Sequence, residues 1–538
     1  MIKENLYLFG VIVLALVLSI AGLNKSPLRG STEPREAGVA AEMLQDGDYL
    51  VPRLNGIPFL EKPPLSYWAQ SASIDMFGYQ YYAPRLPSLL AGIACALLLF
   101  FYLARMTASN AIGGLAAGLL LTMASYWLNS RTAGQDILLT FGVALALFGF
   151  YFARESKRPV WQWLLYCAGL AIATMTKGVI GLAIPGIVIF AYLLADNLLQ
   201  RRFELCAWLL PGALALLALL PFFAWLYVLR ERIGTDAVRE ILLSNSIDRF
   251  AGDYTHGAHA EPFYYYFTKL FEIFQPWTLL LIVAIWQLIQ RLKPSLQQRL
   301  PLAQRTLFFL CWLGAPFLLL SLSAGKRPTY LLMIYPAAAA LIALFIDRLI
   351  SGLRDSPQSL LQQRLQMAYA LILSGTALFI TIRLFKVHAA IAAVFLLITA
   401  SALTVWLWRA LNKTQWQRAG GAGLTLMACI YIAYGFYILP HEARHDAVTP
   451  LFQRAIALHA EGATITLYRP MERIAGAARF YLRGPVLELD TVGQAAQLWH
   501  DDPRAVLIID LSDVGLFPSH RILERITSGK RGFALVGS

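Results

Sequence analysis

Charged residues gather in the stretch that follows the first apolar run of this 538-residue chain. Glu33, Arg35 and Glu36 come first, and Glu61 and Lys62 follow before the second apolar run. Charged side chains are costly to desolvate beside membrane-spanning helices, so they usually mark a functional site there. A carboxylate can deprotonate or orient a nucleophile, while lysine and arginine can neutralise a departing phosphate. The stretch therefore predicts acid–base or electrostatic chemistry at a membrane face.

Each charged motif also has a structural explanation. Glu33 could be an acid at a helix N-terminus, where the helix dipole stabilises negative charge by about 0.3–1 kcal/mol. Glu61 and Lys62 could form a surface ion pair worth roughly 0–1 kcal/mol. Asp136 begins an apolar run and would suit a helix cap, and Lys177 lies at a turn from which its amine could reach the membrane surface. Both interpretations stay open from the residues alone.

Composition identifies a polytopic, all-α membrane protein. Hydrophobic residues make up 58% of the chain and charged residues only 14%. Apolar runs of helix-spanning length recur along most of the sequence. A hydropathy window of about 19 residues predicts about thirteen membrane spans. They lie near residues 6–23, 85–104, 110–128, 137–153, 161–176, 179–196, 207–228, 268–290, 306–323, 329–346, 367–384, 387–408 and 420–439.

Basic residues set the predicted orientation. Short connections such as the one that contains Arg201 and Arg202 should be cytoplasmic by the positive-inside rule. The N-terminus is then cytoplasmic and the first helix is an uncleaved span, so residues 24–84, 229–267 and everything after about residue 440 lie outside. These basic turns and anionic lipids account for the net charge of +13, so nucleic-acid binding is not expected.

Two segments of the chain should have structure outside the spans. Residues 24–84 are predicted to form two amphipathic helices on the membrane, one from Pro34 to the Gly47 turn and one after Pro63-Pro64. The chain should divide at about residue 440 into a membrane domain, 1–440, and a periplasmic α/β domain, 441–538. Apolar runs in the second domain lie at 463–467, 485–489, 505–510 and 533–536, between helical patterns at 447–460, 470–482 and 491–499.

Two more charged segments lie on the predicted outer side. Residues 253–261 hold two histidines and two acids. The segment Lys326-Arg327-Pro328-Thr329-Tyr330 carries positive charge where the positive-inside rule expects little, so topology explains it less well than ligand binding. No P-loop, HExxH motif or GxSxG elbow in its context is present, which disfavours a nucleotide hydrolase, a zincin and a serine hydrolase.

These motifs together resemble a known family. They are similar to those of the C-type-fold membrane glycosyltransferases that use polyprenyl-phosphate sugars, and among them the aminoarabinose transferases that modify lipid A, relatives of the protein O-mannosyltransferases. The resemblance covers nearly the whole chain and implies thirteen spans, a long first periplasmic loop and a C-terminal periplasmic α/β domain. The motifs are Thr32-Glu33-Pro34-Arg35, Phe59-Leu60-Glu61-Lys62-Pro63-Pro64, Asp136, Thr176-Lys177-Gly178, residues 249–259 and residues 323–330.

The resemblance implies roles for individual residues. Lys62 and Tyr330 would bind the polyprenyl phosphate with help from a basic residue of the second outer loop, Arg249. Glu61 and His259 would match positions that can hold a divalent metal ion such as zinc or magnesium. The resemblance also implies inversion at the anomeric carbon by direct displacement.

The first motif departs from the family pattern of Asp-Glu followed by Arg-Tyr. Thr32 replaces the Asp and Glu36 replaces the Tyr, so Glu33 is the best remaining acid beside Asp136. A site changed in this way could serve another sugar or acceptor.

We therefore expect a bacterial inner-membrane glycosyltransferase whose active site faces the periplasm. It would move a sugar, such as 4-amino-4-deoxy-L-arabinose, from undecaprenyl phosphate or a similar polyprenyl phosphate to lipid A or a related glycolipid. Glu33, Asp136 and Arg35 would be catalytic. The substrate-binding residues would be Lys62, Lys177, Arg249, Lys326, Arg327 and Tyr330.

Two alternatives remain from the sequence. The acceptor could be a protein hydroxyl or another envelope glycan, which must be deprotonated and would need a base more than an ionised phosphate does. The chain could instead be a lipid or solute transporter. Transport would predict ionisable residues near the bilayer midplane and internal symmetry, whereas here the charge lies at the predicted outer face.

Overall fold

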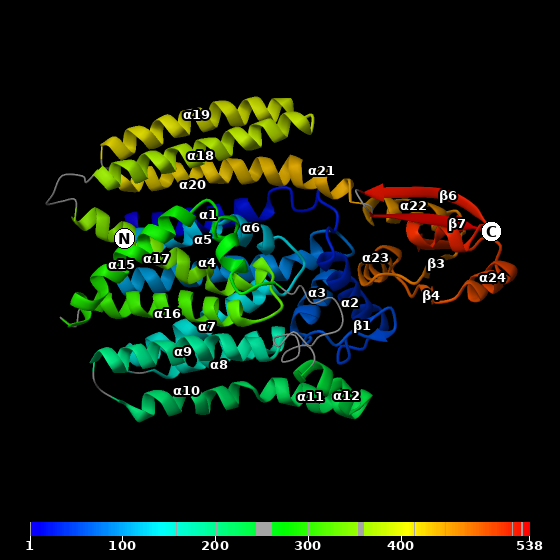
Figure 1. The fold of residues 1–538 in the computed structure, drawn as a ribbon, viewed down its shortest axis with the longest axis horizontal. Helices are drawn as coiled ribbons and strands as arrows, with labels where there is room; N and C mark the ends of the chain where they lie inside the picture. Colours follow the sequence, from blue (N-terminus) through cyan, green and yellow to red (C-terminus); the bar gives the residue numbers. More distant parts are fainter. Residues whose placement is uncertain are drawn as a thin grey trace.

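The computed structural model describes residues 2–538 except 158, 201–202, 244–260, 298–300, 353–359, 414, 447, 519 and 529–530. A long helical body and a smaller C-terminal α/β unit lie end to end, with two helices of the first loop between them (Figure 1). The N-terminus lies in the body at the end far from the C-terminal unit (Figure 1). The end of the body next to that unit is called the loop face below.

The helical body is built from these elements in chain order: α1 (Ile2–Ile20), α4 (Leu86–Thr107), α5 (Asn110–Leu121), α6 (Ala124–Ser130), α7 (Asp136–Glu155), α8 (Val160–Lys177), α9 (Val179–Gln200), α10 (Leu205–Ala218), α11 (Leu220–Ile233), α12 (Thr235–Arg239), α14 (Tyr265–Ile273), α15 (Thr278–Gln297), α16 (Pro301–Leu322), the 3₁₀ helix η3 (Pro328–Ile334), α17 (Tyr335–Gly352), α18 (Leu360–Lys386), α19 (Ala390–Asn412) and α20 (Trp416–Ala433). Helices α18, α19 and α20 form a layer along one side (Figure 1).

Many of these helices have the length and composition of membrane spans. The described residues contain nine such helices, or up to eleven if each bent helix pair counts as one span. The predicted number of thirteen is not confirmed, because α1 contributes only a shorter apolar helix and α8 is not among the nine. The chain is nevertheless a multi-pass membrane protein.

Two predicted spans are broken helices rather than continuous ones. The pair α5 and α6 is bent by 73° and the pair α14 and α15 by 114°. The two breaks contact each other: the backbone N–H of Ala124 donates to the carbonyl of Gln275 at 2.8 Å, and the indole N–H of Trp277 donates to the Thr122 hydroxyl at 3.0 Å. Backbone groups within a membrane must find protein partners, so each break supplies partners to the other.

The first loop contains α2 (Thr32–Asp46) and α3 (Leu65–Phe77). The predicted end of α2 at Gly47 is confirmed: Gly47 has φ 70° and its N–H bonds the carbonyl of Met43, as in an αL cap. The expectation of a helix lying on the membrane is wrong for α2. Most of its residues are buried, including the carboxylates of Glu33 and Glu36, because it packs against α3 and against the C-terminal unit.

The C-terminal unit is an α/β structure, as expected. Its five-stranded sheet has the order β4-β3-β5-β7-β6, in which β4, β3 and β5 are parallel and β7 and β6 are antiparallel additions. The strand β6 was not predicted. The unit comprises α22 (Val448–Ala460), β3 (Ile465–Tyr468), α23 (Glu472–Leu482), β4 (Leu487–Leu489), α24 (Val492–Asp501), β5 (Val506–Asp510), β6 (Arg521–Ser528) and β7 (Arg531–Gly537). Helix α21 (Leu439–Arg444), which continues the α20 span, leads into it.

Helix α23 docks the C-terminal unit onto α2. The two backbones touch where glycines face each other: a Cβ at Gly38 would lie 2.3 Å from the Cα of Gly476. Beside this crossing, Arg479 pairs with Glu42 at 3.2 Å and with Asp46 at 2.8 Å. The sheet unit therefore fixes the position of α2, and α2 carries the charged residues of the first motif.

Candidate functional site

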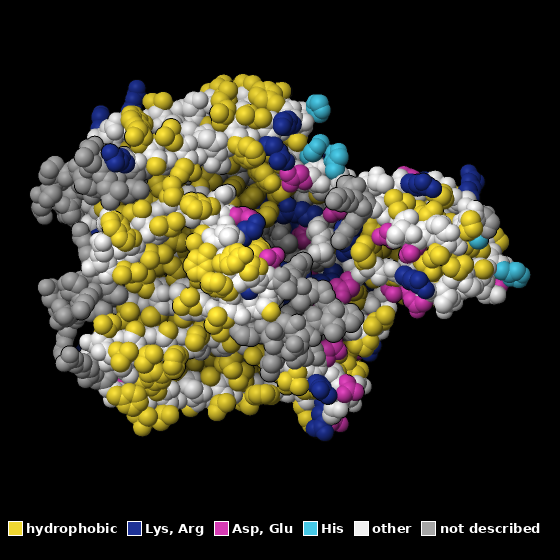
Figure 2. Space-filling view, in the orientation of Figure 1, with side chains coloured by type: hydrophobic (Ala, Val, Ile, Leu, Met, Phe, Trp, Pro, Cys, Tyr) yellow, Lys and Arg dark blue, Asp and Glu magenta, His cyan; other side chains and the backbone are white. Residues whose placement is uncertain are grey.

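Charged side chains from several elements meet at the loop face. Figure 2 shows basic and acidic side chains inside a hollow between the helical body and the C-terminal unit. The contributing elements are the start of α2, the segment before α3, the start of α7, the end of α8 and η3.

Glu33, at the start of α2, lies in a closed network. Arg85 donates to its carboxylate from Nε and from Nη2, each at 2.7 Å. The backbone N–H groups of Arg29 and Ala133 donate to the same carboxylate at 3.0 and 2.9 Å. Burial alone would raise the pKa of Glu33, but Arg85 holds this pKa below its usual value. These contacts favour a structural role for Glu33, in which it anchors the first loop to the helical body.

Arg35, Glu36, Glu61 and Lys62 form an alternating group of charges. Arg35 Nη2 lies 3.3 Å from Glu36 Oε1 and 3.4 Å from Glu61 Oε2. Lys62 Nζ lies 3.4 Å from the same two oxygens. Burial lowers the pKa of Arg35, but the carboxylates of Glu36 and Glu61 raise it by more, so the guanidinium stays charged. The contacts of both cations to Glu36 and Glu61 are long, while the other guanidinium nitrogen of Arg35, Nη1, bonds Glu472 at 2.9 Å.

Glu36 was predicted to belong to the charged cluster but was given no catalytic or binding role of its own. It is fully buried, and the amide of Gln135 donates to its second oxygen, Oε2, at 2.9 Å. Tyr67 of α3 is buried beside it, and burial together with the Glu36 carboxylate raises the pKa of the Tyr67 hydroxyl well above its usual value. The sequence offered one signal for Glu36, its place next to Arg35. Its contact with Gln135 depends on a fold that the sequence did not reveal.

Asp136, Lys177 and Tyr330 form the other half of the site. Asp136 is the first residue of α7 and Lys177 the last of α8, and the Lys177 amine contacts Asp136 Oδ1. The same amine lies 4.6 Å from the centre of the Tyr330 ring in η3. Gln135 precedes Asp136 in the chain, so it joins this trio to the charges on α2. We call the whole set the loop-face cluster: Arg35, Glu36, Glu61, Lys62, Gln135, Asp136, Lys177 and Tyr330.

Lys326 and Arg327, the two other predicted substrate-binding cations near Tyr330, are not part of the loop-face cluster. Lys326 is buried and its amine donates to the backbone carbonyls of Ser323 and, at 2.7 Å, Glu261. This placement favours a role in fixing the segment that leads into η3. The backbone carbonyl of Arg327 accepts a hydrogen bond from the Tyr266 hydroxyl at 3.2 Å. The remaining predicted residues, Arg249 and His259, lie outside the described residues.

The described residues do not fit a metal site. In the part of the chain that the structure covers, no group of three His, Cys, Asp or Glu side chains could hold a metal ion. Glu61, one predicted ligand, lies between Arg35 and Lys62, whereas zinc and magnesium sites gather several neutral or anionic donors. A metal at Glu61 and His259 stays a prediction.

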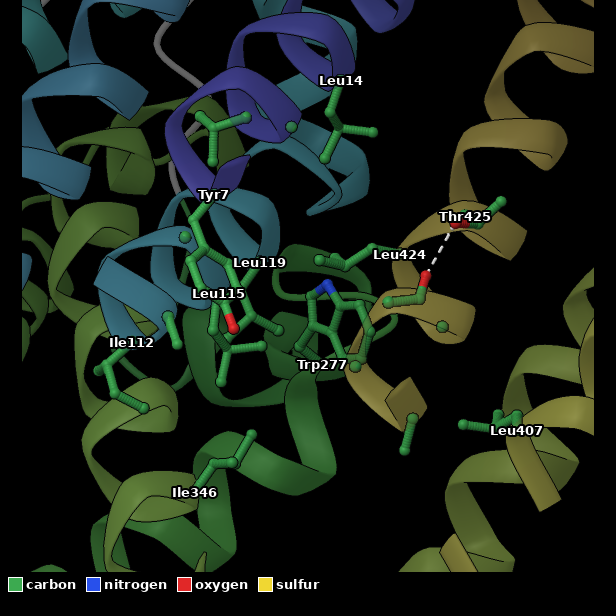
Figure 3. Close-up of a pocket in the computed structure, with 18 of the residues that line it drawn as sticks. Tyr7, Leu14, Ile112, Leu115, Leu119, Trp277, Ile346, Leu407, Leu424 and Thr425 are labelled. Atoms are coloured by element: carbon green, nitrogen blue, oxygen red, sulfur yellow. Dashed lines mark hydrogen bonds between the residues drawn. The ribbon is translucent and has the colours of Figure 1, made fainter. Parts of the chain in front are cut away.

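A separate apolar cavity of about 760 Å³ lies within the helical body. Figure 3 shows Leu115 and Leu119 of α5, Leu424 of α20, and Trp277 from the break just before α15 around it. No residue of the loop-face cluster lines this cavity. Its mostly aliphatic lining suits hydrocarbon chains and does not supply the paired cations and carboxylates that sugar transfer from a phosphate requires.

Comparisons with known proteins show similarity to glycosyltransferases. A family model described as dolichyl-phosphate-mannose-protein mannosyltransferase matches residues 61–225. An undecaprenyl phosphate-alpha-4-amino-4-deoxy-L-arabinose arabinosyl transferase from Serratia proteamaculans is 27% identical over 91% of this chain and 86% of its own length. A protein with the same description, numbered 2, from Proteus mirabilis is 29% identical over 64% of this chain, and the match spans only 60% of that relative.

A solved structure shares the fold. The crystal structure of ArnT from Cupriavidus metallidurans bound to undecaprenyl phosphate has a TM-score of 0.74 and 18% sequence identity, over 98% of both chains. The fold match covers the helical body and the C-terminal unit alike. The family model, the curated relatives and the shared fold together support a relationship to the membrane glycosyltransferases that include the aminoarabinose transferases and the protein mannosyltransferases.

Proposed function

We propose that the chain transfers a sugar from a polyprenyl-phosphate donor to lipid A or a related glycolipid at the periplasmic face of a bacterial inner membrane. One observation carries this proposal: the loop-face cluster gathers three cations, Arg35, Lys62 and Lys177, and a partly exposed acid, Asp136, at one end of the helical body. The positive-inside pattern supports the periplasmic orientation. Charge concentrated at this end favours transfer chemistry over the transporter alternative, which requires ionisable groups near the midplane.

The donor phosphate would bind at Lys62 and Arg35. Their contacts to Glu36 and Glu61 measure 3.3–3.4 Å, longer than the roughly 2.7–2.9 Å of strong charge-assisted hydrogen bonds. An entering phosphate can therefore form shorter contacts to the same cations. The names of the relatives include undecaprenyl phosphate and aminoarabinose, which supports this donor class.

Transfer needs one bond to form and one to break. An acceptor oxygen attacks the anomeric carbon of the sugar while the bond from that carbon to the phosphate oxygen breaks. The electron pair leaves with the polyprenyl phosphate, whose new charge Lys62 and Arg35 neutralise. A phosphate acceptor is already ionised and releases no proton, whereas a hydroxyl acceptor must give its proton to a base. Asp136, partly exposed beside Lys177, is the carboxylate placed to take it.

The first test is mass spectrometry of lipid A from cells with the protein present, absent or carrying Lys62→Ala. A sugar-sized mass that requires both the protein and Lys62 would support the proposal and identify the sugar class. Lys269→Ala is the matched control, because Lys269 is an exposed lysine paired with Glu272 outside the cluster. A spectrum that is the same with and without the protein would overturn lipid A as the acceptor.

A second variant separates the acceptor classes. With an ionised phosphate acceptor, we expect Asp136→Asn to lower kcat by less than about tenfold, since no proton is removed. A hydroxyl acceptor would require general-base catalysis, whose loss costs about 10²–10⁴ in rate. A loss in that range, measured with the purified protein, would indicate protein hydroxyls or another envelope glycan as the acceptor.

A further inference from the structure

The C-terminal unit reaches directly into the loop-face cluster. Glu472, the first residue of α23, accepts a hydrogen bond from Arg35 Nη1 at 2.9 Å. One helical turn further along α23, Gly476 crosses the backbone of the same residue: a Cβ there would lie 2.5 Å from the Pro34 carbonyl oxygen and 2.6 Å from Arg35 Cα. The same face of α23 thus contacts both the backbone and the guanidinium of Arg35.

The guanidinium of Arg35 is held from two sides. Nη2 faces Glu36 and Glu61, while Nη1 faces Glu472. The Glu472 contact is the shortest of the three, and the ring of Phe59 lies 5.3 Å from the guanidinium carbon. Without Glu472, the guanidinium would be drawn only toward Glu36 and Glu61, the carboxylates that it shares with Lys62.

We propose that Glu472 is a positioning residue, through which the C-terminal unit holds the Arg35 guanidinium in place for the donor phosphate. This inference rests on the proposed function, in which Arg35 binds that phosphate. It gives the C-terminal unit a part in donor binding.

Stability alone does not account for this contact. The Glu472 side chain is 56% exposed, and such solvent-screened pairs contribute little to folding. The docking of the unit has stronger supports elsewhere: the glycine crossing of α2 and α23, the buried Arg479 with its two acids, and Asn55, whose amide donates to Glu488 at 2.7 Å. Removing Glu472 therefore leaves the unit docked and changes chiefly the position of Arg35.

The test is the affinity of the purified full-length protein for undecaprenyl phosphate, measured by calorimetric titration in detergent. We expect Glu472→Ala to weaken binding about tenfold, the scale of one hydrogen bond to a charged group. Glu472→Gln keeps an acceptor oxygen at the same place, so it should retain most of the affinity. Simple electrostatics predicts the opposite effect of Glu472→Ala on affinity, because removing a negative charge near an anion site strengthens anion binding.

Two controls make the result specific. Glu524→Ala removes the same charge from the same unit, where Glu524 pairs with Arg454 at 3.2 Å, and should leave affinity unchanged. In an Arg35→Gln background, Glu472→Ala should have no further effect, since the pair acts as one unit. Equal affinities for Glu472→Ala and wild type, tighter binding by Glu472→Ala, or additive losses in the double variant would each overturn the inference.

A wild-type protein that does not bind undecaprenyl phosphate would overturn the proposed function and this inference together.

Discussion

At the scale of single residues, two acids at the loop face have opposite surroundings. Glu33 receives four hydrogen bonds, two from Arg85 and two from backbone N–H groups, and is fully buried. Asp136 contacts the Lys177 amine and its side chain is 26% exposed. A base must reach the proton that it removes. Asp136 meets this condition, and Glu33 would have to leave its ion pair to do so.

The anchor role of Glu33 predicts a stability effect. Glu33→Gln leaves the charge of buried Arg85 without its partner, which costs about 3–5 kcal/mol. We expect a clearly lower melting temperature for the detergent-solubilised variant. The double variant Glu33→Gln with Arg85→Met removes the orphaned charge and should recover part of the loss. If Glu33→Gln melted like wild type but had lost transfer activity, Glu33 would be a catalytic acid instead.

Sequence reasoning selected most of the cluster but not its internal contacts. Lys62, Asp136, Lys177 and Tyr330 were named from charge at span ends and from the resemblance, and they lie together. Glu36 was named as part of the charged stretch and as a replacement for a family tyrosine, with no role assigned to it. Its significance depends on Gln135, which is 99 residues away in the chain. Such contacts are set by tertiary packing, about which local charge patterns carry no information.

At the scale of elements, local signals predicted helix ends better than helix surroundings. Gly47 ends α2 because a glycine adopts the left-handed conformation without strain. The burial of α2 could not be predicted, because its partner α23 lies more than 400 residues further along the chain, as the separation of 437 between Arg35 and Glu472 shows. Hydropathy also missed the bends between α5 and α6 and between α14 and α15, since a window average is insensitive to helix direction.

The α2–α23 crossing predicts a cost for any side chain at its glycines. In Gly476→Ala, the new Cβ would lie 2.5 Å from the Pro34 carbonyl oxygen, and overpacking of this kind costs about 1–3 kcal/mol. We expect a lower melting temperature and faster proteolysis of the C-terminal unit. Gly493→Ala, in α24 of the same unit, meets no atom within 4 Å and is the matched control. Equal proteolysis of the two variants would show that α23 does not depend on this close approach.

At the scale of the whole molecule, the lipid-facing spans and the charged residues proposed for catalysis lie in different parts of the protein. The spans carry exposed apolar side chains along the body, whereas the loop-face cluster and the C-terminal unit lie at one end (Figures 1 and 2). An enzyme that joins a lipid-linked donor to a lipid acceptor needs both substrates at one membrane surface. The proposed reaction therefore depends on which side of the membrane this end faces.

The two ends of α19 provide the test of that orientation. His388, just before the helix, and Asn412, its last residue, are both exposed, and the helix between them is long enough to span the membrane. His388 lies at the loop-face end, beside His441 of α21. In a Cys206→Ser background, which removes the exposed native thiol, a membrane-impermeant maleimide should label His388→Cys in cells with a permeabilised outer membrane. Asn412→Cys should react only after the inner membrane is opened. The reverse pattern would place the cluster in the cytoplasm and exclude a periplasmic acceptor.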